Sequence, residues 1–294
     1  MKVKESTYTR YYRNVYVYLL PELGSKRLTN ISCQDLKDFA NKLMACGGSK
    51  ARPLSAKTVG DILCVLKAIM RFGRTNGYAC PDLDDLSYPK KKKNRAEILP
   101  EDVRIKIENR LWDSEDCVSL GILFTLYTGV RIGELCGLQW GDFDFDSGVV
   151  YIRRTVERIS DLDPNSKAKT KVIVSEPKTE NSQRMIPLPS FLATHIKQFA
   201  GEKHHYVITG TARYSEPHLF YLRYKTFLKK TCVPDYSFHT LRHTFATRCV
   251  EHGFDTKSLS EILGHANIAT TLSLYVHPTL EQKRKQMERL SPTF

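Results

Sequence analysis

Apolar side chains recur every three or four positions along the first part of this 294-residue chain, a spacing that predicts amphipathic helices. We expect four such helices over about the first 85 residues. The clearest apolar stripes cover residues 8–19, 36–43 and 59–70. Their helices should end at Pro21, at Gly47, and at Gly73 or Gly77, in that order.

The pattern changes in the second part of the chain. An apolar run over residues 117–130 predicts a buried helix. Alternating and β-branched segments then predict strands over 148–154, 171–177 and 183–188, with a polar turn, KTENS, between the last two. From about Ser190 the helical spacing returns. The expected fold class is therefore mainly α with a small antiparallel β-sheet, an α+β fold.

Four consecutive lysines, Lys90, Lys91, Lys92 and Lys93, follow a proline and indicate a solvated linker. Residues 1–95 carry 19 Lys and Arg against 8 Asp and Glu, whereas the remainder carries 26 against 24. A basic front segment is typical of a protein that binds nucleic acid. A merely soluble basic surface is the alternative at this stage. We predict a helical, basic first domain, a basic linker, a second domain and a tail helix, over 1–88, 89–99, 100–279 and 280–294.

Nothing in the sequence is typical of an exported or membrane protein. The N-terminal residues lack the apolar core of a signal peptide, and the run over 117–130 is too short to span a bilayer. The eight cysteines are dispersed without a C-x-x-C pair, which indicates reduced thiols. These features predict a cytoplasmic protein.

The segment FHTLRHTFATR, residues 238–248, places His239, Arg242 and His243 on one face of an expected helix. The two histidines have the i, i+4 spacing of a zinc-binding helix, but Thr240 stands where the zinc motif needs a glutamate. An arginine fork that holds phosphate oxygens, with a histidine one turn away, explains the pattern better than a metal site does. For this segment alone, an ordinary solvated face is still the better explanation.

Three further segments add candidate groups. Arg131 follows an apolar helix and a glycine turn, and Glu134 lies one helical turn on, where a carboxylate can hold the guanidinium. Lys178 lies on the polar turn between two predicted strands. His265 follows a helix-ending glycine, and Tyr275 lies on the next helix.

Taken in order, the segments TGVRIGEL, HTLRHTFATR and LGHANIATTLSLY closely resemble the tyrosine recombinase (phage integrase) family, most of all the integrases of conjugative transposons and temperate phages. The resemblance covers about residues 5–280. It implies a SAM-like helical core-binding domain followed by a catalytic domain, with no metal and no cofactor. Integrases of that branch usually carry a further small domain that binds arm-type DNA sites, so this is either a short recombinase or a chain without its N-terminus.

The resemblance also implies a role for each candidate. Tyr275 attacks a DNA phosphate, which leaves a 3′-phosphotyrosine and a free 5′-hydroxyl. Arg131 and Arg242 would neutralise the charge on the phosphate, and His265 would donate a hydrogen bond to it. Lys178 would protonate the departing 5′-oxygen, and His239 would help to transfer the proton from Tyr275. We assign Glu134 to holding Arg131, and His243 to supporting the packing of its helix.

The implied partners are double-stranded DNA at core sites, bound in part by the lysine linker, and three further copies of the chain. The four copies would form a synaptic tetramer joined through the C-terminal tail. An accessory DNA-bending or excision factor could assist, and the complex would act on the nucleoid of a bacterium. Two alternatives are a type IB topoisomerase-like enzyme, which rejoins the same strand, and a DNA-binding module without a reactive tyrosine. The DNA target, the direction of the reaction and the role of residues 155–170 do not follow from the sequence.

Overall fold

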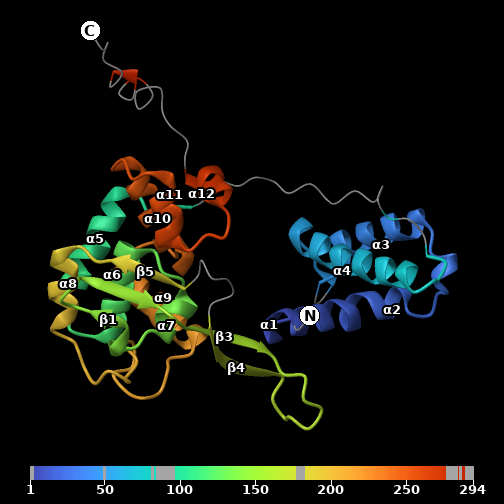
Figure 1. Ribbon diagram of the computed structural model, residues 1–294, viewed down its shortest axis with the longest axis horizontal. Helices are drawn as coiled ribbons and strands as arrows, with labels where there is room; N and C mark the ends of the chain where they lie inside the picture. The colour runs from blue at the N-terminus through green and yellow to red at the C-terminus, as the bar shows by residue number, and fades with distance from the viewer. Residues whose placement is uncertain are drawn as a thin grey trace. The chain divides into compact units, whose positions relative to one another are not determined.

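The computed structural model describes residues 3–48, 51–80, 83, 97–176, 183–275, 284 and 287–288. The chain divides into two compact units (Figure 1). Unit 1 comprises Met1–Asn94 and Ile159–Lys171, and unit 2 comprises Arg95–Arg158 and Val172–Phe294. The boundary predicted over 89–99 stays a prediction, because most of those residues, including the four linker lysines, lie outside the described part.

Unit 1 is built from helices: α1 (Glu5–Arg13), the π-helical η1 (Asn14–Leu19), α2 (Leu20–Leu23), the 3₁₀ turn η2 (Leu28–Asn30), α3 (Cys33–Cys46) and α4 (Ala56–Thr75). Helical backbone continues past Pro21, where we expected it to stop. Pro21 enters in the first turn of α2, directly after a π-helical segment, where a proline needs no intrahelical donor. The described residues before position 81 thus hold three helical stretches besides η2, where four helices were expected.

The core of unit 1 lies mainly between α3 and α4. Helix α3 starts at Ser32, whose hydroxyl accepts a hydrogen bond from the Asp35 amide while the Asp35 carboxylate accepts one from the Ser32 amide. It ends before Gly47, as predicted. The buried apolar residues contributed by the two helices are Leu36, Phe39, Leu43, Val59, Ile62, Leu63, Val65, Leu66 and Met70.

Unit 2 is organised around α6 (Cys117–Thr128), which is buried along almost its whole length, as the apolar run predicted. Helices α5 (Glu101–Trp112), α9 (Pro217–Lys230) and α10 (Phe238–Glu251) pack against α6, and α8 (Ser190–Lys197) also contacts it. Because α6 is covered on all sides, its two ends are held firmly in place. The C-terminal end of α6 leads directly into the turn that carries Arg131.

A three-stranded sheet lies in unit 2, and a two-stranded sheet lies between its strands in the sequence. The strands β1 (Phe143–Asp144), β2 (Val149–Ile152) and β5 (Arg184–Pro187) form an antiparallel sheet in the order β1-β2-β5, with Val150 opposite Ile186 and Ile152 opposite Arg184. The predicted strand over 171–177 is β4 (Thr170–Ser175), which pairs with β3 (Thr155–Ser160). Strand β3 was not predicted, and it explains part of the segment 155–170. The expected fold class, mainly α with a small antiparallel sheet, is confirmed.

Helices α10, α11 (Thr256–Leu263) and α12 (Ile268–Tyr275) lie together at one end of unit 2 (Figure 1). A separate small core joins them, made of Ala246, Cys249, Leu259, Leu263 and Tyr275. The short helices α7 (Ile132–Gly137) and η4 (Trp140–Asp142) connect α6 to the sheet. Within the described residues, none of the helices combines the length and the apolar character needed to cross a membrane.

Candidate active site

The turn between α6 and α7 positions Arg131. Helix α6 ends at Gly129, which adopts the left-handed conformation with φ of 65°. A Cβ atom there would lie 2.5 Å from a ring carbon of Phe245, so both the backbone and the packing require glycine. Two residues later Arg131 begins α7 with its side chain 38% exposed. The guanidinium therefore stands on a rigid turn and stays open to a ligand.

Glu134 contacts Arg131, the residue that we assigned it to hold. Its carboxylate accepts a hydrogen bond of 2.9 Å from the Arg131 backbone amide and one of 2.7 Å from the Arg131 Nη1. Both of its oxygens also accept from Arg184, at 3.1 and 3.0 Å. Burial by itself would raise the pKa of Glu134, but Arg184 and Arg131 outweigh it and lower the pKa to about 2. Glu134 is thus a buried anion shared by two guanidinium groups.

Arg184 is a site residue that the sequence analysis missed. It begins β5 and is almost fully buried, and its Nε donates to the Ile262 carbonyl at 2.5 Å in addition to its bonds with Glu134. It therefore ties the sheet to the end of α11. The sequence held no clear signal for this role, because an arginine at the start of a strand is usually exposed. Only the fold brings Glu134 opposite to it.

Arg242 lies at the centre of the site and is 1% exposed. Its Nη1 donates to the Gly129 carbonyl at 2.6 Å and its Nη2 to the Leu263 carbonyl at 2.7 Å. Burial, followed by the charge of Arg131, lowers the pKa of Arg242 to about 9, so the group stays charged at neutral pH. Two of its five donor N–H groups are used by the turns before α7 and after α11, which fixes the guanidinium in place.

His265 follows Gly264, a second left-handed glycine, at the end of α11. Its Nδ1 lies 2.8 Å from the hydroxyl oxygen of the fully buried Thr271, which was not predicted as a site residue. Burial and then the charges of Arg242 and Arg131 lower the pKa of His265 to about 4, so the ring is neutral at pH 7. When the Thr271 hydroxyl donates to Nδ1, the proton sits on Nε2, which can then donate to a ligand.

Tyr275 ends α12 with its side chain 6% exposed. Its hydroxyl oxygen lies 2.6 Å from Nδ1 of His243, and its ring stacks parallel to that of His265 with a centroid distance of 6.4 Å. Burial raises the pKa of Tyr275, although Arg242 and Arg131 act in the opposite direction. The structure thus brings Tyr275 into the same cluster as the two predicted arginines.

The two histidines of α10 differ from our expectation. We assigned proton transfer from Tyr275 to His239 and only helix packing to His243, but the histidine that contacts the Tyr275 hydroxyl is His243. The ring of His239 packs edge-on against that of His243 with a centroid distance of 4.4 Å. The two histidines share one face of α10 and differ in their position along it: His243 lies one turn further on, nearer to the α10 residues that form a core with Tyr275.

The cluster as a whole suits a phosphate group. Three guanidinium groups lie near the single carboxylate of Glu134: Arg131 and Arg184 bond to it, and Arg242 is close enough to feel its charge. The cluster thus has an excess of fixed positive charge beside a tyrosine hydroxyl. Lys178 lies outside the described residues, so its expected place here stays a prediction. Among the residues described, potential metal ligands lie close together at Glu202, His204 and His205. These three residues belong to a loop outside this cluster.

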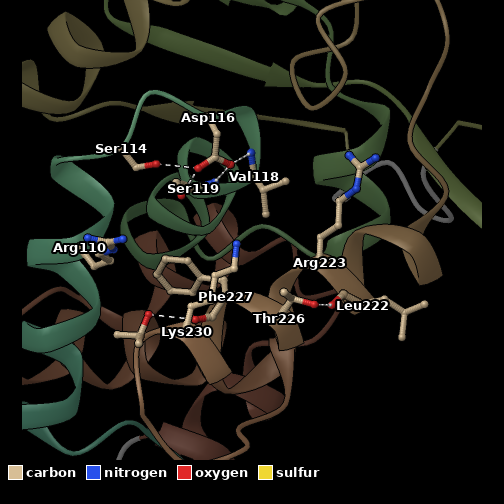
Figure 2. A pocket seen from close by; sticks show the side chains of 11 residues that line it. Arg110, Ser114, Asp116, Val118, Ser119, Leu222, Arg223, Thr226, Phe227 and Lys230 are labelled. Atoms are coloured by element: carbon tan, nitrogen blue, oxygen red, sulfur yellow. Dashed lines mark hydrogen bonds between the residues drawn. The ribbon is translucent and has the colours of Figure 1, made fainter.

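A separate cavity of about 550 Å³ lies at the opposite end of α6 (Figure 2). Arg110, Arg223 and Lys230 line it, together with Asp116, whose carboxylate caps α6 by accepting hydrogen bonds from the amides of Val118 and Ser119 and from two serine hydroxyls. None of the predicted site residues lines this cavity. It is therefore distinct from the cluster around Tyr275.

Comparison with known proteins finds related sequences over both units. The model of the Phage integrase family matches residues 97–282, and that of the phage integrase N-terminal SAM-like domain matches residues 1–44. A protein named tyrosine recombinase XerC-like, from Caldanaerobacter subterraneus subsp. tengcongensis, is 28% identical over all of this chain and 80% of its own length. The transposase of transposon Tn916 from Enterococcus faecalis is 28% identical over 58% of this chain, and the match spans only 44% of that relative.

Solved structures share the fold. The integrase of transposon Tn1549, in complex with transposon right end DNA, matches with a TM-score of 0.76 and 22% identity over 99% of this chain and 95% of that one. A lambda integrase dimer bound to a COC′ core site matches with a TM-score of 0.65 and 18% identity over 92% and 88% of the two chains. At this level of identity the likeness concerns the fold.

Proposed function

This chain belongs to the phage integrase family of tyrosine recombinases, and we propose that it cleaves and rejoins DNA at specific sites through a covalent link between Tyr275 and a DNA phosphate. The reaction serves the integration or excision of a mobile element. The observation that carries the assignment to Tyr275 is the position of its hydroxyl, which is buried against His243 beside Arg131 and Arg242.

The arrangement supports in-line attack on a phosphodiester. As the tyrosine oxygen bonds to phosphorus, charge accumulates on the non-bridging oxygens, where Arg131, Arg242 and the Nε2 of His265 can hold it. Arg242 is held by two backbone carbonyls before any ligand binds, so its charge needs little reorganisation during the reaction. The bond energy is stored in the phosphotyrosine and returned on rejoining. Lys178 protonates the departing 5′-oxygen in this scheme.

The partners follow from the same proposal. The substrate is a double-stranded core site, contacted by the basic residues of 1–95 and by the linker lysines 90–93. The solved relatives include a lambda integrase tetramer bound to a Holliday junction, and we propose a tetramer here too, with the tail over 280–294 docking one copy to the next. An accessory bending or excision factor completes the complex, which acts on the bacterial nucleoid in the cytoplasm.

A covalent-adduct assay tests the function. The protein is mixed with a nicked candidate core site in EDTA, and a denaturing gel is inspected for protein bound to DNA. We expect an adduct from the wild type and none from Tyr275→Phe, which loses one oxygen and should keep its affinity for DNA. An adduct from the phenylalanine variant would show that another residue is the nucleophile.

A second assay separates the recombinase from the topoisomerase alternative. Two plasmid-borne core sites are incubated with the protein, and exchange of flanking markers is measured beside relaxation of a supercoiled plasmid that lacks a site. A recombinase exchanges the markers. Relaxation of the site-free plasmid without any exchange would favour the topoisomerase-like alternative instead.

A further inference from the structure

The hydroxyl of Tyr275 has a partner that family resemblance does not assign to it. His243 Nδ1 lies 2.6 Å from this oxygen, and the two rings meet at a centroid distance of 5.5 Å. Resting on the proposed function of Tyr275 as nucleophile, we propose that His243 is the catalytic base of strand cleavage. Its Nδ1 takes the proton of the Tyr275 hydroxyl while the oxygen attacks the DNA phosphate.

The geometry meets the first requirement of a general base, which is hydrogen-bond contact with the proton that it removes. His243 is half-buried on α10, and its position relative to α12 is fixed by the small core of Ala246, Cys249 and Tyr275. For Nδ1 to accept, the proton of the neutral ring must sit on Nε2. His239 packs edge-on against this ring from one turn earlier and so acts as a positioning residue for His243.

The charges around His243 make its basicity depend on the substrate. Arg242 and His239 face it from α10, and Tyr275 faces it from α12, while Arg131 and His265 lie beside Arg242 in the same cluster. Burial and then Arg242 lower the pKa of His243, which favours the neutral ring in the absence of DNA. A phosphodiester held by Arg131 and Arg242 brings negative charge beside the ring and favours the imidazolium.

The step balances without any further reactant. The bond between the tyrosine oxygen and phosphorus forms, the hydroxyl proton passes to Nδ1, and the bond between phosphorus and the 5′-oxygen breaks. The leaving oxygen takes its proton from Lys178, as the proposed function assigns. On rejoining, a 5′-hydroxyl attacks the phosphotyrosine and gives its proton to the neutral amine of Lys178, and the imidazolium returns its proton to Tyr275.

The test compares matched substitutions of three histidines in or next to one helix. His243→Asn keeps an acceptor oxygen near the place of Nδ1 but cannot take up a proton, His239→Asn removes the neighbouring ring, and the exposed His252→Asn, just after α10, is the control. Single-turnover adduct formation on the nicked core site is measured between pH 5.5 and 9, together with core-site affinity and the melting temperature. If H243N melts well below the wild type, His243→Gln, which fills more of the space, replaces it.

We expect H243N to bind the core site like the wild type and to form adduct at least ~10²-fold more slowly at pH 7, the scale of general base catalysis. Its rate should rise about tenfold per pH unit above neutrality, because the phenol must then ionise without help, whereas the wild-type rate should be level there. H239N should lose part of the rate, because its ring positions His243, but should keep the wild-type pH profile, and H252N should match the wild type in both. A wild-type rate and profile for H243N, or the loss and the slope in H239N instead, would overturn the proposal.

A modified substrate gives an independent check. With sulfur in place of the bridging 5′-oxygen, the leaving group departs without a proton, so the substrate bypasses the general acid alone. H243N should stay slow on it, and recovery to the wild-type rate would place His243 on the leaving-group side and contradict the proposal. Failure of the proposed function would be seen in a different result: the wild type would form no adduct, or Tyr275→Phe would still form one.

Discussion

At the scale of single residues, a buried carboxylate organises this site. Glu134 is 4% exposed and accepts four hydrogen bonds, two from Arg131 and two from Arg184. A buried ion pair adds little net stability, but removal of one partner leaves the other charges uncompensated. Glu134 therefore decides whether Arg131 and Arg184 can lie close together beneath Arg242.

We predict that Glu134→Gln destabilises the protein by ~3 kcal/mol at pH 7, because the buried Arg184 and the partly exposed Arg131 lose their counter-charge. The folded-state pKa of Glu134, about 2, lies below the ordinary value of 4.5, so its contribution is fully present above pH 4.5 and is lost as the pH falls toward 2. Urea unfolding at pH 7 and at low pH measures this. The gap between wild type and E134Q should close at low pH, and the exposed Glu251→Gln serves as control. A gap independent of pH would contradict the prediction.

At the scale of elements, the site depends on how helices end. Helices α6 and α11 both stop at a left-handed glycine, Gly129 and Gly264, and each is followed within two residues by a site residue. The carbonyl of Gly129 accepts a hydrogen bond from Nη1 of Arg242, and the carbonyl of Gly264 accepts one from Nη2 of Arg131. The helix ends thus position the arginines as well as reverse the chain.

We predict that Gly129→Ala lowers both stability and cleavage, and that Gly210→Ala is its matched control. The two glycines share nearly the same φ, 65° and 64°, so alanine carries a similar backbone cost of about 1–2 kcal/mol at each. A Cβ at Gly129 would press on Phe245 and Leu263, whereas at Gly210 it meets nothing within 4 Å. Melting temperatures and adduct rates check this. Equal losses in the two variants would show that packing at Gly129 does not matter for the site.

At the scale of the whole molecule, charge is divided unevenly along the chain. Of the net charge of +13, residues 1–95 carry most, and the catalytic part is nearly balanced. Non-specific affinity for DNA should therefore depend chiefly on the first part and the linker, while the catalytic part concentrates its unbalanced positive charge around Tyr275.

We predict that changing Lys90, Lys91, Lys92 and Lys93 to glutamine weakens binding to all DNA sequences alike. Removing one lysine–phosphate interaction reduces the slope of log affinity against log salt by roughly 0.9, so the salt dependence should flatten by up to about four times that amount. Binding titrations on a core site and on a random duplex at several salt concentrations measure both effects. A loss confined to the core site would mean that these lysines contribute to sequence recognition.

Local patterns in the sequence were enough to predict the fold class, three of the helical stripes, three of the strands, and the segments that carry the arginines, histidines and tyrosine. These features are local, because a stripe, an alternation or a short motif is set by neighbours within a few turns of the chain. The pair of Arg131 and Glu134 belongs to this group, since one helical turn separates them. The stop expected at Pro21 failed for a local reason too, a π-helical segment that the pattern does not encode.

Which of these residues touch one another is set by the packing of the folded unit. Arg184 and Glu134 are separated by 50 residues, and the hydroxyl of Tyr275 and Nδ1 of His243 by 32, so no spacing rule connects them. Because His239 and His243 share one face of α10, the choice between them depends on the level along α10 at which Tyr275 packs, and therefore on the packing of Ala246, Leu259, Leu263 and Tyr275. Such contacts follow from the burial of apolar faces against one another, which is a property of the whole folded unit and not of any single segment.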